Sequence, residues 1–258
     1  MRIDINCDMG ESFGNYVYGA DEEIVRHISS ANIACGFHAG DPLVMSRTVK
    51  LATVHGVAVG AHPSFPDLLG FGRRELAATE DEVRAYVTYQ VGALAAFARY
   101  HGVSLTHVKG HGAVYNMAAV QPKLAQALAE GVARFDPELV FVGLAGSALI
   151  EAGRAAGLPV AAEAFADRAY NADGTLVSRR LAGAVIHDPD EVAARVVRMA
   201  RDGGVVAVNG SVLQVDPDTI CVHGDTPGAA VLAAAIRRGL AAAGIEVRSL
   251  SASDLQTS

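Results

Sequence analysis

Residues 2–12 read RIDINCDMGES, and this stretch carries the pattern that decides the fold. Apolar and polar side chains alternate along its first part, so that one face is apolar and the other is polar. The apolar members are Ile3, Ile5 and Cys7, and the polar members are Asp4, Asn6 and Asp8. A period of two residues is typical of a β-strand. We therefore expect a strand over residues 2–7 that runs into a glycine-containing turn.

Further apolar or β-rich runs recur along the chain, and helical patterns separate most of them. We expect strands at 31–35, 57–61, 104–109, 139–143, 158–162, 205–209, 219–223 and 245–249. Asp41 and Asp188 each precede a proline, which places a capping carboxylate before a proline at the first helical position. Thr226–Pro227 has a similar arrangement. Thr79 and Glu82 form a capping box for the longest predicted helix.

This alternation of strand and helix predicts an α/β fold with parallel strands. The chain has 258 residues, and a length of about 250 residues suits a closed (β/α) barrel. We therefore expect a single barrel domain over residues 1–258, with a doubly wound open sheet as the alternative.

Composition excludes several classes of protein. The chain is 51% hydrophobic and 19% charged, with a net charge of −7, so it is not intrinsically disordered. No apolar stretch approaches the ~20 residues of a membrane span, and no basic run favours nucleic acid as a partner. The three cysteines form no CxxC pair and cannot build a disulfide framework. The N-terminus lacks the apolar core of a signal peptide, which indicates a cytoplasmic protein.

Polar side chains follow five of the predicted strands at the point where each strand ends. These turns combine Gly or Pro with His, Lys or a carboxylate, and they read CDMGES (7–12), NIACGFHAGD (32–41), GAHPSFPD (60–67), VKGHG (108–112) and CVHGDTPG (221–228). In parallel α/β folds the ligand binds at the carboxyl ends of the strands. The five turns therefore predict one shared site at that end of the fold.

The nine histidines divide according to their position. Four histidines lie at the ends of predicted strands in turns that contain glycine, and we interpret them as functional: His38, His62, His111 and His223. Those that lie away from these turns are interpreted as surface or packing residues, and they are His27, His55, His101 and His187. His107 stays open between the two classes. Asp41 and Asp225 are helix caps in one interpretation and ligand contacts in the other.

Lys109 ends a predicted strand in a chain that has only three lysines. A cation at this point would meet an anionic substrate or a developing oxyanion, and the alternative is a structural ion pair with Asp8 or Glu11. Both carboxylates are candidates for a general base that acts on water. Asp8, His62 and His111 could instead bind a divalent metal. The chain contains neither a GxxxxGK[ST] loop nor a GxGxxG fingerprint for a nucleotide.

Residues 163–181, EAFADRAYNADGTLVSRRL, show no clear period after a predicted strand. Long loops inside compact domains are often lids or binding loops. An ordinary surface excursion explains the composition equally well.

Six motifs together carry a family resemblance. They are DINCDMGES, SANIACGFHAGDP, GAHPSFPD with LLGFGRR, VKGHGAVYN, EAFADRAYNADGTLVSR and CVHGDTPGA. The set resembles the LamB/YcsF family, and the match runs in order from Asp4 to about Val247. The resemblance implies a distorted barrel of about seven parallel strands, related to the polysaccharide deacetylase-like barrel. It also implies the A subunit of an ATP-dependent 5-oxoprolinase, which opens 5-oxo-L-proline to L-glutamate with ATP as cosubstrate and with 5-oxoprolinase subunits B and C as partners.

The expected roles combine this resemblance with the turns. The residues expected to act on water, phosphate or the developing charge are Asp8, Glu11, His38, His62, Lys109 and His111. The residues expected to bind substrate are Asn6, Asn32, Gly36, Arg168, His223 and Asp225. Arg73 and Arg74 are second candidates for anion contact or partner docking. A stand-alone metal-dependent amidohydrolase or deacetylase remains as one alternative, and a non-catalytic protein that only binds the substrate for its partners remains as another.

Overall fold

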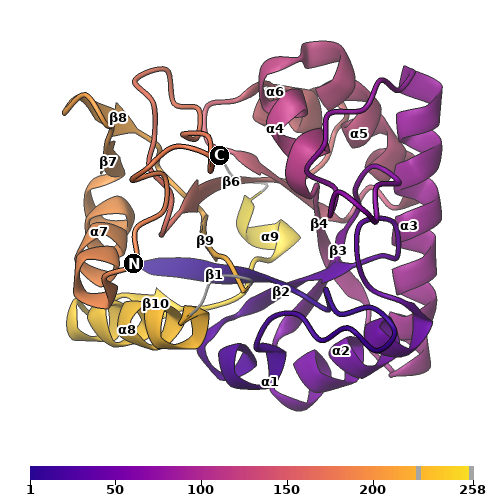
Figure 1. Cartoon of the computed structure of the whole chain (residues 1–258), viewed down its shortest axis with the longest axis horizontal. Helices are drawn as coiled ribbons and strands as arrows, with labels where there is room; N and C mark the ends of the chain where they lie inside the picture. Colours follow the sequence, from indigo (N-terminus) through magenta and orange to yellow (C-terminus); the bar gives the residue numbers. More distant parts are fainter. Residues whose placement is uncertain (225–227, 256–258) are drawn as a thin grey trace.

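A closed barrel of parallel strands forms the centre of the molecule (Figure 1). The computed structural model describes residues 1–224 and 228–255. Around the barrel the strands are β1 (Arg2–Met9), β2 (Ser30–Ala34), β3 (Ala58–His62), β4 (Leu105–Lys109), β5 (Val140–Leu144), β6 (Val160–Phe165) and β9 (Thr219–Val222). β9 pairs with both β6 and β1, which closes the sheet. The predicted barrel is confirmed, and the open sheet is excluded.

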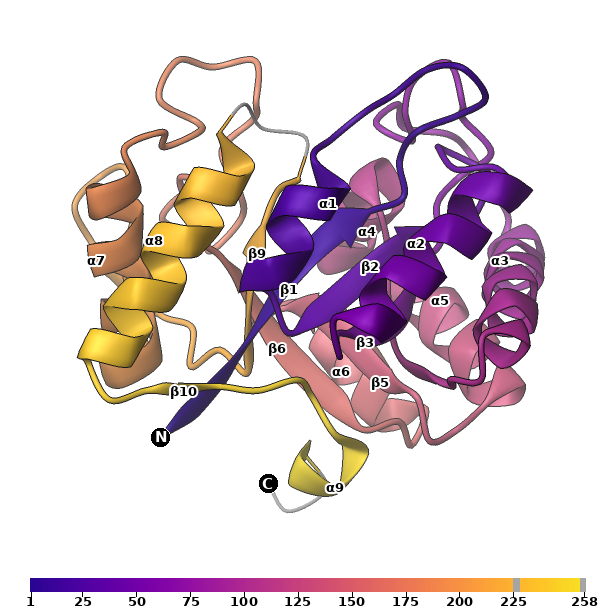
Figure 2. The same ribbon diagram turned by 90° about the horizontal axis from the view of Figure 1, so that it is seen from below.

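Helices cover the outside of the barrel (Figures 1 and 2). They are α1 (Asp21–Ile24), the 3-10 helix η1 (Val25–His27), α2 (Pro42–Val54), α3 (Glu80–Tyr100), α4 (Gly112–Val120), α5 (Pro122–Phe135), α6 (Ala148–Ala155), α7 (Pro189–Asp202) and α8 (Ala229–Ala242). No helix in the described part of the chain is long and apolar enough to cross a membrane.

The predicted helix caps are present. The Asp41 carboxylate accepts from the backbone of α2, and the Asp188 carboxylate does the same for α7. Thr79 and Glu82 form a reciprocal capping box at the start of α3. The expected helix start at Thr226–Pro227 lies outside the described residues.

The two faces of β1 meet different surroundings, as the alternation predicts. Its apolar side chains belong to the main hydrophobic core, which the surrounding helices share. On the other face, Asn6 Nδ2 donates to Glu163 Oε1 of β6 at 2.9 Å and to Thr219 Oγ1 of β9 at 2.7 Å. These contacts among side chains of separate strands place the polar face of β1 inside the barrel.

One end of the barrel is covered by the C-terminal part of the chain. β10 (Glu246–Val247) pairs with the first residues of β1, and α9 (Ala252–Leu255) follows it. Leu250, Ala252 and Leu255 pack on a cluster formed by Val140, Val142 and Ala161, which lie in the first halves of β5 and β6. Figure 2 shows α9 at this end. A ligand would therefore reach the barrel from the opposite end, where the strands finish.

Three sequence-based strand assignments need correction. β1 continues to Met9, so Asp8 belongs to the strand and not to the turn after it. β6 continues to Phe165, so Glu163 is a strand residue and not part of a loop. The expected strand at 205–209 is β7 (Gly204–Val206), which pairs antiparallel with β8 (Val212–Gln214) in a separate sheet. An apolar run indicates a strand but does not indicate which partner the strand will find.

Candidate functional site

The strand ends carry a cluster of buried titratable side chains. Each of them is less than a tenth exposed, and they are Asp8, Glu11, His38, His62, Lys109, His111 and His223. They come from β1, β3, β4 and the turns after β1, β2, β4 and β9. The structure thus brings together every residue that was expected to act on water, phosphate or developing charge.

Asp8 lies at the centre of this cluster. Its Oδ1 lies 3.1 Å from Lys109 Nζ and 3.2 Å from His62 Nε2, and it accepts a hydrogen bond of 2.9 Å from Asn32 Nδ2. Burial by itself raises the pKa of the Asp8 carboxyl, but His62 and Lys109 hold that pKa well below its ordinary value. Asp8 is therefore a carboxylate at neutral pH.

Lys109 occupies a polar chamber below the mouth of the barrel, which is the end where the strands finish. Its Nζ lies 2.8 Å from Glu163 Oε1 and 3.1 Å from Asp8 Oδ1. Burial lowers the pKa of this ammonium, but Asp8 and Glu163 outweigh that effect and raise it well above its ordinary value. The ion pair with Asp8 that the sequence left open is present, and it keeps the charge of Lys109 in place.

Three histidine rings pack together beside Asp8. The rings of His38 and His111 stack with centroids 3.7 Å apart and planes at 6°. His62 Nε2 lies 3.0 Å from His111 Nδ1. Burial lowers the pKa of both His38 and His111 well below the ordinary value. These two imidazoles are therefore neutral at physiological pH.

His223 and Asp167 form another part of the mouth. His223 Nδ1 donates to Asp167 Oδ1 at 2.8 Å, and its ring stacks on Phe165 with centroids 5.4 Å apart. Burial alone raises the pKa of Asp167, but His223 holds it below its ordinary value. A ring nitrogen of His223 lies within 4.8 Å of the Asp8 carboxylate. This pair therefore contacts the same space as Asp8.

Two residues that were expected to bind substrate lie deeper than the others. Asn32 Nδ2 donates to Asn6 Oδ1 at 2.7 Å as well as to Asp8. Asn6 Oδ1 in turn accepts from Lys109 Nζ at 3.2 Å. Both asparagines are almost completely buried. Their side chains therefore hold Asp8 and Lys109 in position from below.

The remaining expected contacts lie in the surrounding turns. Gly36 adopts a φ of 92° in the turn after β2. The buried Arg168 side chain donates through Nη2 to the Val177 carbonyl at 2.6 Å, which ties down the segment after β6. Arg74 pairs with Asp67, and the Arg73 guanidinium lies 4.9 Å from the Phe71 ring centroid. Asp225 lies outside the described residues.

Sequence reasoning missed several members of the network. Glu163 was assigned to an aperiodic segment, although it occupies an alternate position of β6 and points into the barrel. Tyr115 Oη donates to Glu163 Oε2 at 2.6 Å. The role of His107 was left open by the sequence. Its Nε2 lies 2.8 Å from Asn32 Oδ1. A carboxylate within an otherwise apolar strand was the one signal that could have identified Glu163.

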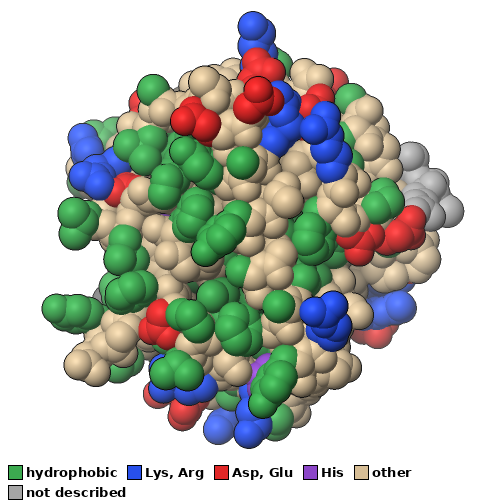
Figure 3. Space-filling model, turned by 90° about the vertical axis from the view of Figure 1, so that its right-hand side faces the viewer, with side chains coloured by type: hydrophobic (Ala, Val, Ile, Leu, Met, Phe, Trp, Pro, Cys, Tyr) green, Lys and Arg blue, Asp and Glu red, His purple; other side chains and the backbone are tan. Residues whose placement is uncertain are grey.

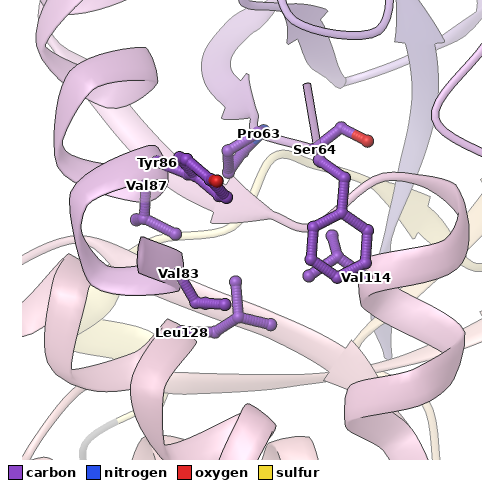
Figure 4. Close-up of a pocket in the computed structure, with 8 residues that line it drawn as sticks. Pro63, Ser64, Val83, Tyr86, Val87, Val114 and Leu128 are labelled. Atoms are coloured by element: carbon purple, nitrogen blue, oxygen red, sulfur yellow. The ribbon is translucent and has the colours of Figure 1, made fainter. Parts of the chain in front are cut away.

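A separate apolar hollow lies outside the barrel (Figure 4). It is lined by side chains of α3, α4, α5 and the turn after β3, namely Pro63, Ser64, Phe65, Val83, Tyr86, Val87, Val114 and Leu128. The lining contains no Asp, Glu, Lys, Arg or His, so the hollow does not suit a charged substrate. The titratable cluster remains the candidate site.

Comparison with known proteins adds to this description. The profile of the LamB/YcsF family matches residues 3–254. A protein from Natranaerobius thermophilus, named as the A subunit of 5-oxoprolinase, is 57% identical over 248 residues, which cover 96% of each chain. A protein of the same name from Chloroflexus aggregans is 58% identical over 96% of this chain and 98% of its own. The crystal structure of a lactam utilization protein from Thermus thermophilus superimposes with a TM-score of 0.92 at 49% identity, covering 97% of this chain and 100% of its own.

Proposed function

Because the chain belongs to the LamB/YcsF family, we propose that it is the A subunit of an ATP-dependent 5-oxoprolinase. In this proposal it opens 5-oxo-L-proline to L-glutamate, with ATP hydrolysis, in a complex with subunits B and C. The names of its relatives support the role. The observation that carries the proposal is the ionised Asp8, which lies at the barrel mouth between Lys109 and His62.

The chemistry explains why ATP would be needed. A five-membered lactam is a resonance-stabilised amide with little ring strain, so water attacks its carbonyl slowly. Transfer of the γ-phosphoryl group of ATP to the lactam oxygen releases ADP and makes the ring carbon electrophilic. Water then adds to that carbon, and the carbon–nitrogen bond breaks as the nitrogen takes up a proton. Hydrolysis of the remaining acyl phosphate yields glutamate and phosphate.

Each titratable residue at the mouth has a proposed role. Asp8 is the carboxylate that takes a proton from the attacking water. Lys109 stabilises the negative charge that develops on oxygen, and it keeps Asp8 ionised. His223, which Asp167 orients and which lies within 4.8 Å of the Asp8 carboxylate, is assigned to substrate binding and to proton donation to the ring nitrogen. Arg168 is assigned to the substrate carboxylate or to the phosphate, because a guanidinium can bind either of them with two hydrogen bonds.

An uncharged surface supports the proposed partner subunits. Between Arg84 and Arg99, α3 carries no charged residue, although Tyr89 in this stretch is 64% exposed. Figure 3, which looks onto the side of the molecule where α3 lies in Figure 1, shows hydrophobic side chains gathered on that face. Large exposed apolar areas are uncommon on monomeric proteins and are typical of interaction surfaces.

The direct test is an assay of glutamate released from 5-oxo-L-proline. The chain is assayed alone and with its candidate partner subunits, in each case with and without ATP. We expect release only from the complete complex with ATP. We also expect Asp8→Asn to reduce release by at least about 100-fold, because general base catalysis contributes roughly 10²–10⁴-fold.

The matched control is Asp202→Asn, an equivalent change at an exposed position at the end of α7. It should leave the rate unchanged. Near-normal ring opening by folded Asp8→Asn protein would remove Asp8 from the mechanism. Hydrolysis of a cyclic amide or an acetyl group by the chain alone, without ATP, would favour the stand-alone amidohydrolase or deacetylase instead.

A further inference from the structure

The geometry of the barrel mouth points to a site for one divalent transition-metal ion of the zinc class. We propose that Asp8, His62 and His111 bind it. The inference concerns the proposed active site, but it depends on the positions of these side chains and not on the proposed reaction.

The backbone fixes the tautomers of two histidines. His62 Nδ1 lies 2.7 Å from the Lys109 carbonyl, and His111 Nε2 lies 2.9 Å from the Phe71 carbonyl. A carbonyl oxygen can only accept a hydrogen bond, so each of these ring nitrogens carries the proton. The nitrogens that face the cluster, His62 Nε2 and His111 Nδ1, are therefore the ones that a metal ion could bind.

These two nitrogens point at each other. They lie only 3.0 Å apart, and Asp8 Oδ1 lies 3.2 Å from His62 Nε2. Three acceptor atoms at such distances need a positive charge between them, which a proton shared among them or a metal ion can supply. A metal ion can take the place of that proton, because metal binding to histidine releases protons. The arrangement is therefore one that a bound cation stabilises.

The spacing of the donor atoms fits a small metal ion. In a tetrahedral zinc site with bonds of about 2.0–2.1 Å, the ligand atoms lie about 3.3–3.4 Å from one another. Asp8 Oδ1 lies 3.2 Å from His62 Nε2, which lies 3.0 Å from His111 Nδ1, and the three ligand atoms all lie within 4.8 Å of one another. Imidazole nitrogens combined with carboxylate oxygens suit zinc and related transition metals better than magnesium or calcium.

The outer contacts of the two histidines are those that metal ligands usually have. A histidine that binds a metal typically donates its other ring proton to a carbonyl or carboxylate, which fixes its orientation. Here the Phe71 carbonyl has this role for His111, and Phe71 has a positive φ of 54°. At the next residue, Gly72, an added Cβ would lie 2.8 Å from the His111 ring. This turn is therefore held tightly against His111.

His38 provides a second, independent observation. Its side chain is completely buried, and neither ring nitrogen has a hydrogen-bond partner among the described residues. Its Nε2 lies 3.4 Å from Glu11 Oε1, beside the proposed ligands. A buried ring without hydrogen bonds is costly unless another ligand compensates it. An ion at this site, or water bound to that ion, would lie within reach of His38.

The test measures metal binding by the purified 258-residue chain in the absence of substrate, ATP and partner subunits. Chelator-treated protein is titrated with zinc chloride by calorimetry, and the zinc that remains after dialysis is measured by mass spectrometry. We expect about one zinc per chain. His111→Ala should weaken binding by more than about 100-fold, because removing only the hydrogen-bond partner of a metal ligand already costs roughly 10–100-fold.

Two further variants keep the test decisive. His55→Ala removes an exposed histidine at the end of α2 and should bind zinc like the unmodified chain. Asp8→Asn preserves the shape of the ligand and should also weaken binding, which covers the case in which His111→Ala does not fold. Cobalt(II) added to the chelator-treated chain should give the visible absorption bands of a tetrahedral nitrogen and oxygen site, and Asp8→Asn should change them.

The inference is overturned if the chain retains no stoichiometric zinc and binds none on titration. It is also overturned if His111→Ala and Asp8→Asn bind zinc as His55→Ala does. Ring opening by an active complex in which this chain binds no zinc would reject the metal site and leave the proposed function standing. Stoichiometric zinc at these residues, in a chain that fails to support ring opening, would confirm the site and reject the proposed function.

Discussion

Asp4 should make the folded protein less stable as the pH rises from 4 to 7. Its carboxyl is almost completely buried at the lower part of the barrel interior. It accepts hydrogen bonds from Ser29 and Ser30 at 2.7 Å each and from Thr219 at 2.5 Å. Burial nevertheless raises the pKa of Asp4 from 3.8 to about 6, because these hydroxyls do not fully replace water around the charge.

The size and sign of the effect follow from this pKa. The folded chain binds the Asp4 proton more tightly than the unfolded chain, so the stabilisation is complete below the unfolded pKa of 3.8 and is lost as the pH rises through about 6. A shift of roughly two pKa units corresponds to about 3 kcal/mol in the free energy of unfolding. The Asp4→Asn variant lacks this titration. Relative to that variant, the unmodified chain should lose about 2–3 kcal/mol between pH 4 and 7.

The assay is urea-induced unfolding followed by circular dichroism at several pH values between 4 and 7. Both chains contain the same other titrating groups, so the difference between their unfolding free energies isolates Asp4. Asp202→Asn, at an exposed position, should follow the unmodified chain throughout. A difference between Asp4→Asn and the unmodified chain that does not change with pH, or that changes in the opposite direction, would refute the reasoning.

Other substitutions test the network above Asp4 and the scaffold around it. Lys109→Met removes the positive charge that compensates the buried carboxylates of Asp8 and Glu163. It should lower the unfolding free energy by roughly 3–5 kcal/mol in urea melts, and an unchanged stability would contradict the pairing. Gly60→Ala places a Cβ 2.1 Å from His107 Nε2, so it should cost about 1–3 kcal/mol and reduce glutamate release, and a variant with unchanged stability and rate would disprove the close contact. Thr79→Ala removes the capping box of α3 and should cost about 1 kcal/mol with no change in rate; a loss of activity in folded protein would show that the start of α3 matters for catalysis.

Much of the fold could be predicted because its signals are local. The alternation in β1 predicts one apolar and one polar face, and the structure confirms both. The caps at Asp41, Thr79 and Asp188 are confirmed because a capping side chain reaches only the next two or three backbone N–H groups. The predicted strand at 205–209 was wrong as a barrel strand, because the choice of partner for an apolar run depends on distant parts of the chain.

Much of the site could be predicted for a related reason. Parallel strands end at the same edge of a sheet, so polar side chains after several strands must meet there. That rule is enough to place His62, His111 and Lys109 together with Asp8. It could not indicate that Glu163 would pair with Lys109, because this contact depends on how far β6 extends and on the register between strands.

The sequence by itself determined that strands and helices alternate, which face of β1 is polar, and which turns carry the reactive side chains. Only the tertiary structure decided that the sheet closes through pairing of β9 with β1, and that closure has a chemical consequence. It brings Glu163 and the residues of β9 beside Asn6 and Lys109 inside one water-poor chamber. The protonated ring nitrogens of His62 and His111 were likewise decided by backbone carbonyls that the fold brings to them. Hydrogen bonds and charge interactions act over a few ångströms in space, whatever the separation along the chain, so the chemistry of this mouth exists only once the barrel has closed.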